Sequence, residues 1–87
     1  MVLKVGDIVE SAAGHDAGER FAVLKTDGEF VLLADGRRRK AEKPKRKKVR
    51  HCRFTGVSAC EIAEKDGQVT NKELRALLGR LTNKNEE

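Results

Sequence analysis

Short apolar runs separated by glycine-containing turns dominate the first third of the chain, a pattern typical of β-strands. The runs cover residues 5–11, 20–25 and 30–34. Asp27-Gly28 and Asp35-Gly36 follow the second and third runs. An Asp-Gly pair between apolar segments favours a tight hairpin turn, because the central positions of such a turn tolerate positive φ. The pattern predicts three strands, and the third is expected to be central because it is continuously apolar.

The basic stretch that follows is expected to extend the sheet. Residues 37–42 are predicted to form a fourth strand and residues 47–52 a short last strand. Pro44 interrupts pairing between them, because it has no N–H donor. Five short strands with tight turns and a minimal core predict a small barrel, since closure removes exposed edges.

Beyond residue 56 the spacing of apolar residues changes from strand-like to helical. Ser58 is followed three residues later by Glu61, a capping-box pattern that predicts a short helix ending near Asp66-Gly67.

A second capping-box pattern, Thr70 with Glu73, precedes a stripe of leucines. The leucines are Leu74, Leu77, Leu78 and Leu81. Their spacing predicts an amphipathic helix, and we expect the stripe to pack within the protein rather than bind a partner. Residues 83–87 are expected to form a frayed tail.

Composition limits the fold to one small domain. The 87 residues include three phenylalanines and no tryptophan or tyrosine, so the core must consist mainly of Val, Leu, Ile and Ala. No signal-peptide pattern and no long apolar run occurs, which predicts a cytoplasmic protein without a membrane span. Cys52 and Cys60 are expected to be reduced thiols.

Charge is strongly segregated along the chain. The net charge is +5, but residues 37–53 hold eleven basic residues and one acidic residue, Glu42, and therefore carry +10. The other residues include eight basic and thirteen acidic ones, a charge of −5. Such a dense cation favours a polyanion, because each neutralised phosphate releases condensed counterions. A nucleic acid is therefore favoured over an acidic protein, a lipid surface or no partner.

Catalytic and metal-binding patterns are missing from the sequence. His15 and His51 have no paired nucleophile and carboxylate, and residues 14–18 lack the Gly-Lys-Ser/Thr ending of a P-loop. The two histidines and two cysteines do not give a familiar zinc spacing. We predict a protein that is not an enzyme and has no cofactor, metal site or small-molecule substrate.

Three segments of the first 24 residues together resemble the KOW motif. They are Val5-Gly6-Asp7-Ile8-Val9, Gly14-His15-Asp16-Ala17-Gly18 and Phe21-Ala22-Val23-Leu24. The basic run ending Lys47-Lys48-Val49-Arg50-His51-Cys52-Arg53-Phe54-Thr55 extends the resemblance, which covers about residues 4–55. The chain resembles KOW ribosomal proteins of the large subunit of archaeal and eukaryotic type, and more closely the short bacterial KOW-domain RNA-binding proteins.

The resemblance implies a KOW motif within an SH3-like barrel and RNA as the partner, usually ribosomal RNA. We expect a mainly β fold, with a barrel of about five short strands over residues 1–55 and a helical extension with a frayed tail over residues 56–87. Such a protein acts on or near the large ribosomal subunit, as a component or as an accessory of translation or assembly. Ribosomal proteins are then further partners.

The predicted RNA-binding residues lie mostly in the basic segment 37–53. They are Arg20, Arg37, Arg38, Arg39, Lys40, Lys43, Lys45, Arg46, Lys47, Lys48, Arg50 and Arg53. The KOW loop adds Gly14, His15, Asp16 and Gly18. His15, Ala17 and Glu19 occupy positions where the family often has lysine, so the main contacts are expected in the basic segment. No aromatic residue lies inside that segment, which favours recognition of folded RNA through phosphates and 2′-hydroxyls over base stacking.

The alternative function is a protein-interaction adaptor, because SH3-like barrels also dock proteins and the leucine stripe offers an apolar face. Steep salt dependence and tolerance of substitutions at Leu77 and Leu78 favour RNA binding. Shallow salt dependence with loss on Leu77→Glu favours the adaptor. DNA binding is a weaker third, since no helix pairs a basic face with a helix-turn-helix arrangement.

Overall fold

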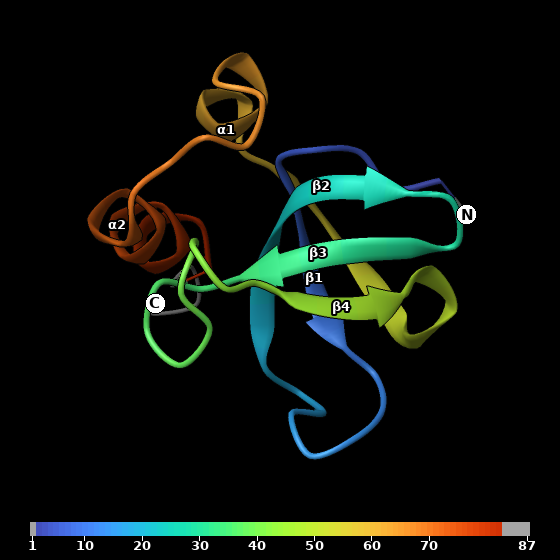
Figure 1. The fold of residues 1–87 in the computed structure, drawn as a ribbon. Coiled ribbons are helices and arrows are strands. Elements are labelled where there is room, and N and C mark those ends of the chain that lie inside the picture. Colours follow the sequence, from blue (N-terminus) through green and yellow to red (C-terminus); the bar gives the residue numbers. More distant parts are fainter. Residues whose placement is uncertain (1, 83–87) are drawn as a thin grey trace.

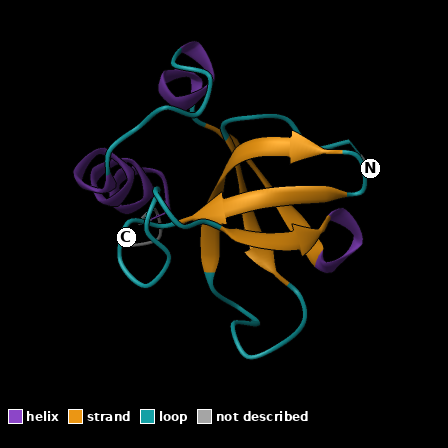
Figure 2. Cartoon of the chain, in the orientation of Figure 1, coloured by secondary structure: helices purple, strands orange, loops and turns teal. Residues whose placement is uncertain are grey.

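The chain folds as a five-stranded antiparallel sheet followed by two helices in the computed structural model, which describes residues 2–82 (Figure 1). The elements are β1 (Asp7–Ser11), β2 (Arg20–Asp27), β3 (Phe30–Ala34), β4 (Lys45–Lys48), a 3₁₀ helix (Val49–His51), β5 (Cys52–Ser58), α1 (Cys60–Glu64) and α2 (Asn71–Thr82). Strands make up most of the regular structure (Figure 2). The mainly β fold with a C-terminal helix is confirmed, and the expected frayed tail lies outside the described residues.

The sheet is strongly curled. Its strand order is β4-β3-β2-β1-β5, so β4 and β5 lie at opposite edges although only the 3₁₀ helix joins them. A flat sheet would separate these edges by about 19 Å, whereas the four residue steps from Lys48 to Cys52 reach at most about 14 Å. Curling brings the edges together. Within residues 2–82 no hydrogen-bonded ladder joins β4 to β5, so the sheet is not closed into a barrel.

β2 is buried on both of its faces from Phe21 to Leu24, which explains its continuous apolar run. Successive side chains in a strand point to opposite faces. Phe21 and Val23 join an inner core made by the sheet and the N-terminal segment, whereas Ala22 and Leu24 face the helices. The inner core contains Leu3, Val9, Phe21, Val23, Val31, Leu33 and Cys52. The helix-side core contains Ile8, Ala22, Leu24, Ala34, Ala59, Ile62, Val69, Leu74 and Leu78.

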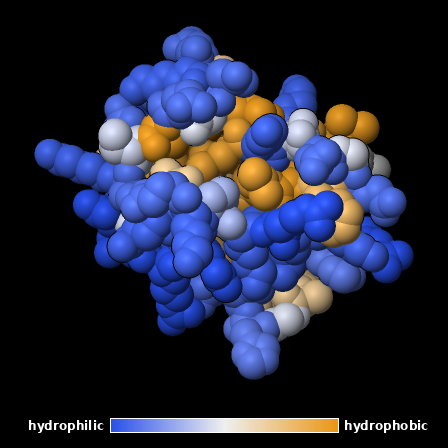
Figure 3. All heavy atoms as spheres, viewed as in Figure 1, coloured by the Kyte–Doolittle hydropathy of each residue, from blue (hydrophilic) through white to orange (hydrophobic). Residues whose placement is uncertain are grey.

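The leucine stripe of α2 packs within the protein, as predicted. Leu74 and Leu78 are buried in the helix-side core, and Leu77 and Leu81 lie half-buried at its border. Figure 3 shows apolar surface between the helices and the strands, which marks the outer border of this core. The helices and one face of the sheet therefore form the helix-side core together.

One of the two predicted capping boxes is present. Thr70 Oγ1 accepts a hydrogen bond from Glu73 N (3.1 Å) while Glu73 Oε1 accepts one from Thr70 N (2.9 Å), so the box at α2 is confirmed. The box at Ser58 is wrong, because the N-cap residue of α1 is Ala59. Ser58 belongs to β5, and its hydroxyl donates to Asp7 of the paired strand β1 (2.7 Å).

Gly67 ends the α1 segment and fits it against β2. Its φ is +80°, and its N–H donates to Ile62 O (2.9 Å) in the manner of a helix C-terminal motif. A Cβ added here would collide with the backbone carbonyl of Leu24. This position therefore needs glycine for its positive φ and for close approach to the sheet.

The predicted fourth strand over residues 37–42 is wrong, because residues 35–44 form a loop. Asp35 Oδ1 accepts hydrogen bonds from Arg37 N and Arg39 N, both 2.9 Å, so a local turn replaces strand pairing. The predicted last strand over 47–52 is divided between β4 and the 3₁₀ helix. β5 was not predicted, and it runs across the expected domain boundary after residue 55. The division at that boundary stays a prediction.

Candidate nucleic-acid interface

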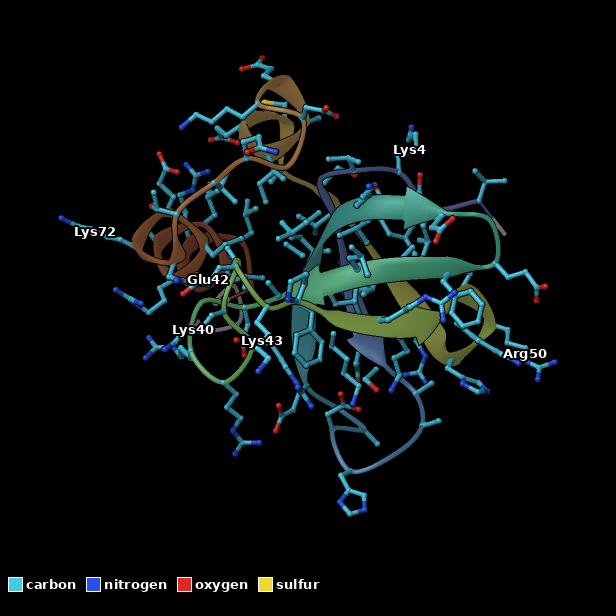
Figure 4. The ribbon with its side chains drawn as sticks, viewed as in Figure 1. Lys4, Lys40, Glu42, Lys43, Arg50 and Lys72 are labelled. Atoms are coloured by element: carbon cyan, nitrogen blue, oxygen red, sulfur yellow. The ribbon has the colours of Figure 1, made fainter. Side chains whose placement is uncertain are left out.

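The structure distributes the basic segment over three places. Arg37, Arg38, Arg39, Lys40 and Lys43 lie in the β3–β4 loop, Lys45, Arg46, Lys47 and Lys48 form β4, and Arg50 and Arg53 follow. Arg20 begins β2 and lines a hollow together with Asp35, Arg37 and Arg75. Figure 4 places Lys40 and Lys43 beside α2, and Arg50 at the opposite end of the molecule. The segment therefore extends across the molecule, from α2 to the far end of β4.

The β3–β4 loop is attached to α2 by hydrogen bonds. Asn71 Oδ1 accepts one from Ala41 N (2.7 Å), and Asn71 Nδ2 donates to Glu42 Oε1 (2.8 Å). Arg75 donates to Gly36 O (2.9 Å). The hydrogen bond from Asn71 holds the pKa of Glu42 below its ordinary value. The first turns of α2 thus set the position of the loop.

A cationic surface results where the loop meets α2. It contains Arg37, Arg39, Lys40, Lys43, Lys72 and Arg75, here called the loop–helix surface. Figure 4 shows Lys40, Lys43 and Lys72 on the same side of the molecule, with Glu42 among them. None of these six residues forms an ion pair with another described residue. The sequence analysis missed Lys72 and Arg75, although their i, i+3 spacing places both on the polar side of the predicted helix.

Two of the predicted RNA-binding arginines are paired with carboxylates on the surface. Arg38 lies 2.6 Å from Glu19, and Arg53 lies 3.8 Å from Glu10. Both arginine side chains are mostly exposed, so these pairs contribute little to stability. A phosphate must still compete with the carboxylate at each arginine.

Alternation along β4 separates its four basic residues. Lys45 and Lys47 pair with Leu33 and Val31, which face the inner core, so their side chains extend toward that side of the sheet. Arg46 and Lys48 point to the other face. Lys47 is buried and is consequently not available on the surface. The sequence analysis had grouped all four as RNA contacts.

Lys45 and Lys47 converge on Asp16 of the predicted KOW loop. Lys47 Nζ donates to Asp16 Oδ1 (3.1 Å) and to Ala13 O (3.0 Å), and Ser11 Oγ donates to Asp16 Oδ1 (2.7 Å). Lys45 Nζ lies 3.2 Å from Asp16 Oδ2, an ion pair without hydrogen-bond geometry. Asp16 therefore connects the loop to the edge strand.

Asp16 is ionised at all ordinary pH values. Burial alone would raise the pKa of its carboxyl, but the hydrogen bonds from Ser11 and Lys47 and the ion pair with Lys45 together outweigh burial and hold the pKa well below its usual range. Gly14, His15 and Gly18 of the same loop are exposed, and both glycines have positive φ. Within this loop, Asp16 is directed inward and the other three predicted residues are accessible.

Arg46 stacks on an aromatic ring. Its guanidinium carbon lies 3.6 Å from the centroid of the Phe30 ring. Phe30 precedes the basic segment in the sequence and was therefore not predicted to belong to the site. Pairing of β3 with β4 brings Phe30 to that segment from outside it.

Cys52 is buried and Cys60 is exposed, and both are free thiols. Burial raises the pKa of the Cys52 thiol. Among residues 2–82, no three of His, Cys, Asp and Glu gather closely enough to hold a metal ion. None of the described helices is long and apolar enough to cross a membrane.

No protein-family model matches the chain, and no curated protein matches its sequence.

Proposed function

We propose that this protein binds folded RNA through the loop–helix surface. The observation that carries the proposal is the attachment of the basic loop to α2, which places cations from two distant segments on one side. Holding together six cations that form no ion pair with a described residue costs electrostatic energy, and a phosphate backbone relieves it by releasing its counterions. Arginines bind phosphates in bidentate fashion and lysines act as point charges.

RNA is preferred to DNA because of the resemblance to KOW-domain proteins. The curled sheet with five short strands is compatible with the SH3-like barrel of that family, and Gly14 and Gly18 supply the positive φ that its loop requires. Ribosomal RNA on or near the large subunit is the proposed target. The protein acts there by binding and not by catalysis, in the cytoplasm, as a ribosomal component or an accessory of translation or assembly.

The adaptor hypothesis has less support. One of its two reasons was the leucine-striped helix as an apolar face, but Leu74 and Leu78 are buried in the helix-side core. A substitution such as Leu78→Glu would disrupt the fold and is no test of partner binding. Leu77→Glu, at the border of the core, remains the variant that tests partner binding.

Salt dependence of RNA binding tests the proposed mechanism. If about six phosphates are neutralised, log K should fall against log salt with a slope near −5. Lys40→Gln should reduce the magnitude of that slope by about 1. Lys4→Gln, at an exposed lysine away from the loop–helix surface in Figure 4, is the matched control and should leave it unchanged. A slope near zero for the unmodified protein, measured by fluorescence anisotropy with a structured RNA, would reject the mechanism.

Sedimentation tests the ribosomal assignment separately. We expect the protein in a lysate to migrate with the large subunit at low salt and to leave it at higher salt. Lys40→Gln combined with Lys43→Gln should shift the protein to the top of the gradient at salt concentrations where the unmodified protein still migrates. A protein that stays at the top at every salt concentration, yet binds structured RNA with a steep slope, has a different RNA target.

A further inference from the structure

We infer that Arg46, stacked on Phe30, forms a binding site for one unpaired nucleobase of the RNA. This inference rests on the proposed RNA-binding function and adds a base contact to what would otherwise be recognition of the phosphate backbone. It also differs from the sequence-based expectation, in which recognition through phosphates and 2′-hydroxyls is favoured over base stacking.

Strand pairing builds the stack. Phe30 pairs with Lys48 and Leu32 pairs with Arg46, so Phe30 and Arg46 are diagonal neighbours on one face of the sheet. The guanidinium carbon lies 3.6 Å from the centroid of the ring. The ring is half-buried and belongs to β3. The contact between Arg46 and Phe30 therefore exists before any ligand arrives.

Arg46 is accessible to a ligand. It is exposed, and no hydrogen bond or ion pair with a described residue occupies its guanidinium. Unstacked bases of RNA stack on arginine planes as well as on aromatic rings. A base placed on Arg46 would form the third layer of a Phe30–Arg46–base stack, with the cation between two π-systems.

A hollow of about 360 Å³ lies at the end of β4, where Lys48 pairs with Phe30. It is lined by Gly28, Glu29, Lys48, Val49 and Arg50. The lining combines two cations with one carboxylate, so it suits a nucleoside with donor and acceptor groups and a neighbouring phosphate better than a bare anion. Lys48 and Arg50 can hold the phosphates on either side of a base that rests on Arg46. Arg50 lies far from Lys40 and Lys43, so this contact is separate from the loop–helix surface (Figure 4).

A purely structural role for the pair makes a different prediction. If Arg46 only covers Phe30 at the edge of the sheet, its substitution changes stability and leaves the choice of RNA unaffected. If Arg46 holds a base, its substitution removes a preference for RNAs with an unpaired nucleotide.

Three RNA hairpins separate these roles. One is fully paired, the second has a single bulged adenosine, and the third has an abasic bulge that keeps the backbone and lacks the base. The unmodified protein should bind the adenosine bulge about tenfold more tightly than the other two, in line with the strength of base stacking. Arg46→Lys keeps the charge but lacks the plane, so it should bind all three hairpins with equal affinity. Arg39→Lys makes the same exchange on the loop–helix surface and should keep the tenfold preference.

Each outcome decides between the proposals. Equal binding of the three hairpins by the unmodified protein, with steep salt dependence, overturns the base site and leaves the proposed function intact. A preference that survives Arg46→Lys also overturns it, as does equal binding of adenosine and abasic bulges. Binding of none of the hairpins overturns the proposed function itself. Thermal unfolding of the two lysine variants is the control that tests whether both are folded.

Discussion

Replacing Gly67 with alanine is expected to reduce the free energy of unfolding by about 3 kcal/mol, a large part of the stability of so small a domain. An L-residue at φ +80° is strained, and the new Cβ collides with the carbonyl of Leu24. That carbonyl belongs to the central strand β2, so it cannot move without disturbing the sheet. Urea denaturation monitored by circular dichroism measures the loss.

Gly28→Ala is the matched control. Gly28 also has positive φ, +63°, but no atom lies within 4 Å of its added Cβ. Gly28→Ala should therefore lower the free energy of unfolding only through backbone strain, by about 1 kcal/mol. Equal losses at the two sites would mean that the segment between α1 and α2 moves away from β2 without cost. The helix-side core would then be looser than its burial indicates.

The first three strands follow from local signals in the sequence. β3 was predicted with its observed ends, because an uninterrupted apolar run lies between two Asp-Gly pairs. The capping box at Thr70 identified the start of α2, since both of its hydrogen bonds form between residues close in sequence. Such signals need no knowledge of the rest of the chain.

Prediction failed where tertiary contacts decide the structure. The side chain of Asp35 organises the loop that was expected to be a strand, and Asn71 then holds that loop from thirty residues away. Ser58 fits a capping box equally well in sequence, but pairing of β5 with β1 directs its hydroxyl to Asp7. Neither the attachment of this loop nor the hydrogen bond of Ser58 can be recognised from neighbouring residues in the sequence alone.

The candidate site was predicted from the charge of the basic segment. The division of its basic residues between the interior and the surface was not predicted. The density of cations sets residues 37–53 apart in the sequence, but strand alternation directs Lys47 inward and Arg46 outward. Lys72 joins the surface only because α2 packs beside the loop. A sequence can show how much charge is present, whereas the fold determines which charges face solvent.

Asp16→Ala is expected to destabilise the protein by about 3 kcal/mol, because it leaves the ammonium of Lys47 buried without a counter-charge. This loss is at the lower end of the range usual for breaking a buried ion pair. The pair lies beneath one loop, and Lys47 keeps its hydrogen bond to Ala13 O when Asp16 is replaced. The double variant Asp16→Ala with Lys47→Met should be more stable than Asp16→Ala alone, since it removes the unpaired charge. Additive losses in this double-mutant cycle, measured by urea denaturation, would contradict the coupling.

The pH dependence of stability provides an independent measurement of the same pair. The pKa of Asp16 is lower in the folded protein than in the unfolded chain, where it has the ordinary value of 3.8. The stabilisation is therefore fully present above about pH 5 and is lost as the pH falls toward the lower, folded-state pKa. Asp16→Asn should lack this component, so the stability difference between the two proteins should shrink on acidification. Parallel curves between pH 6 and pH 2.5 would show that the network contributes no charge-dependent stability.

This pair also decides which lysines of the basic segment serve RNA binding. Lys47 is buried on Asp16, so Lys47→Met should lower stability and leave the RNA affinity of the folded protein at neutral pH nearly unchanged. Lys40→Gln should lower the RNA affinity and leave stability nearly unchanged, because Lys40 is exposed and makes no ion pair with a described residue. Two adjacent parts of one cationic segment would then have separate roles, with Lys47 attaching the predicted KOW loop to β4 and Lys40 contacting phosphate. An RNA affinity that falls more for Lys47→Met than for Lys40→Gln would place the interface on the β4 side of the sheet.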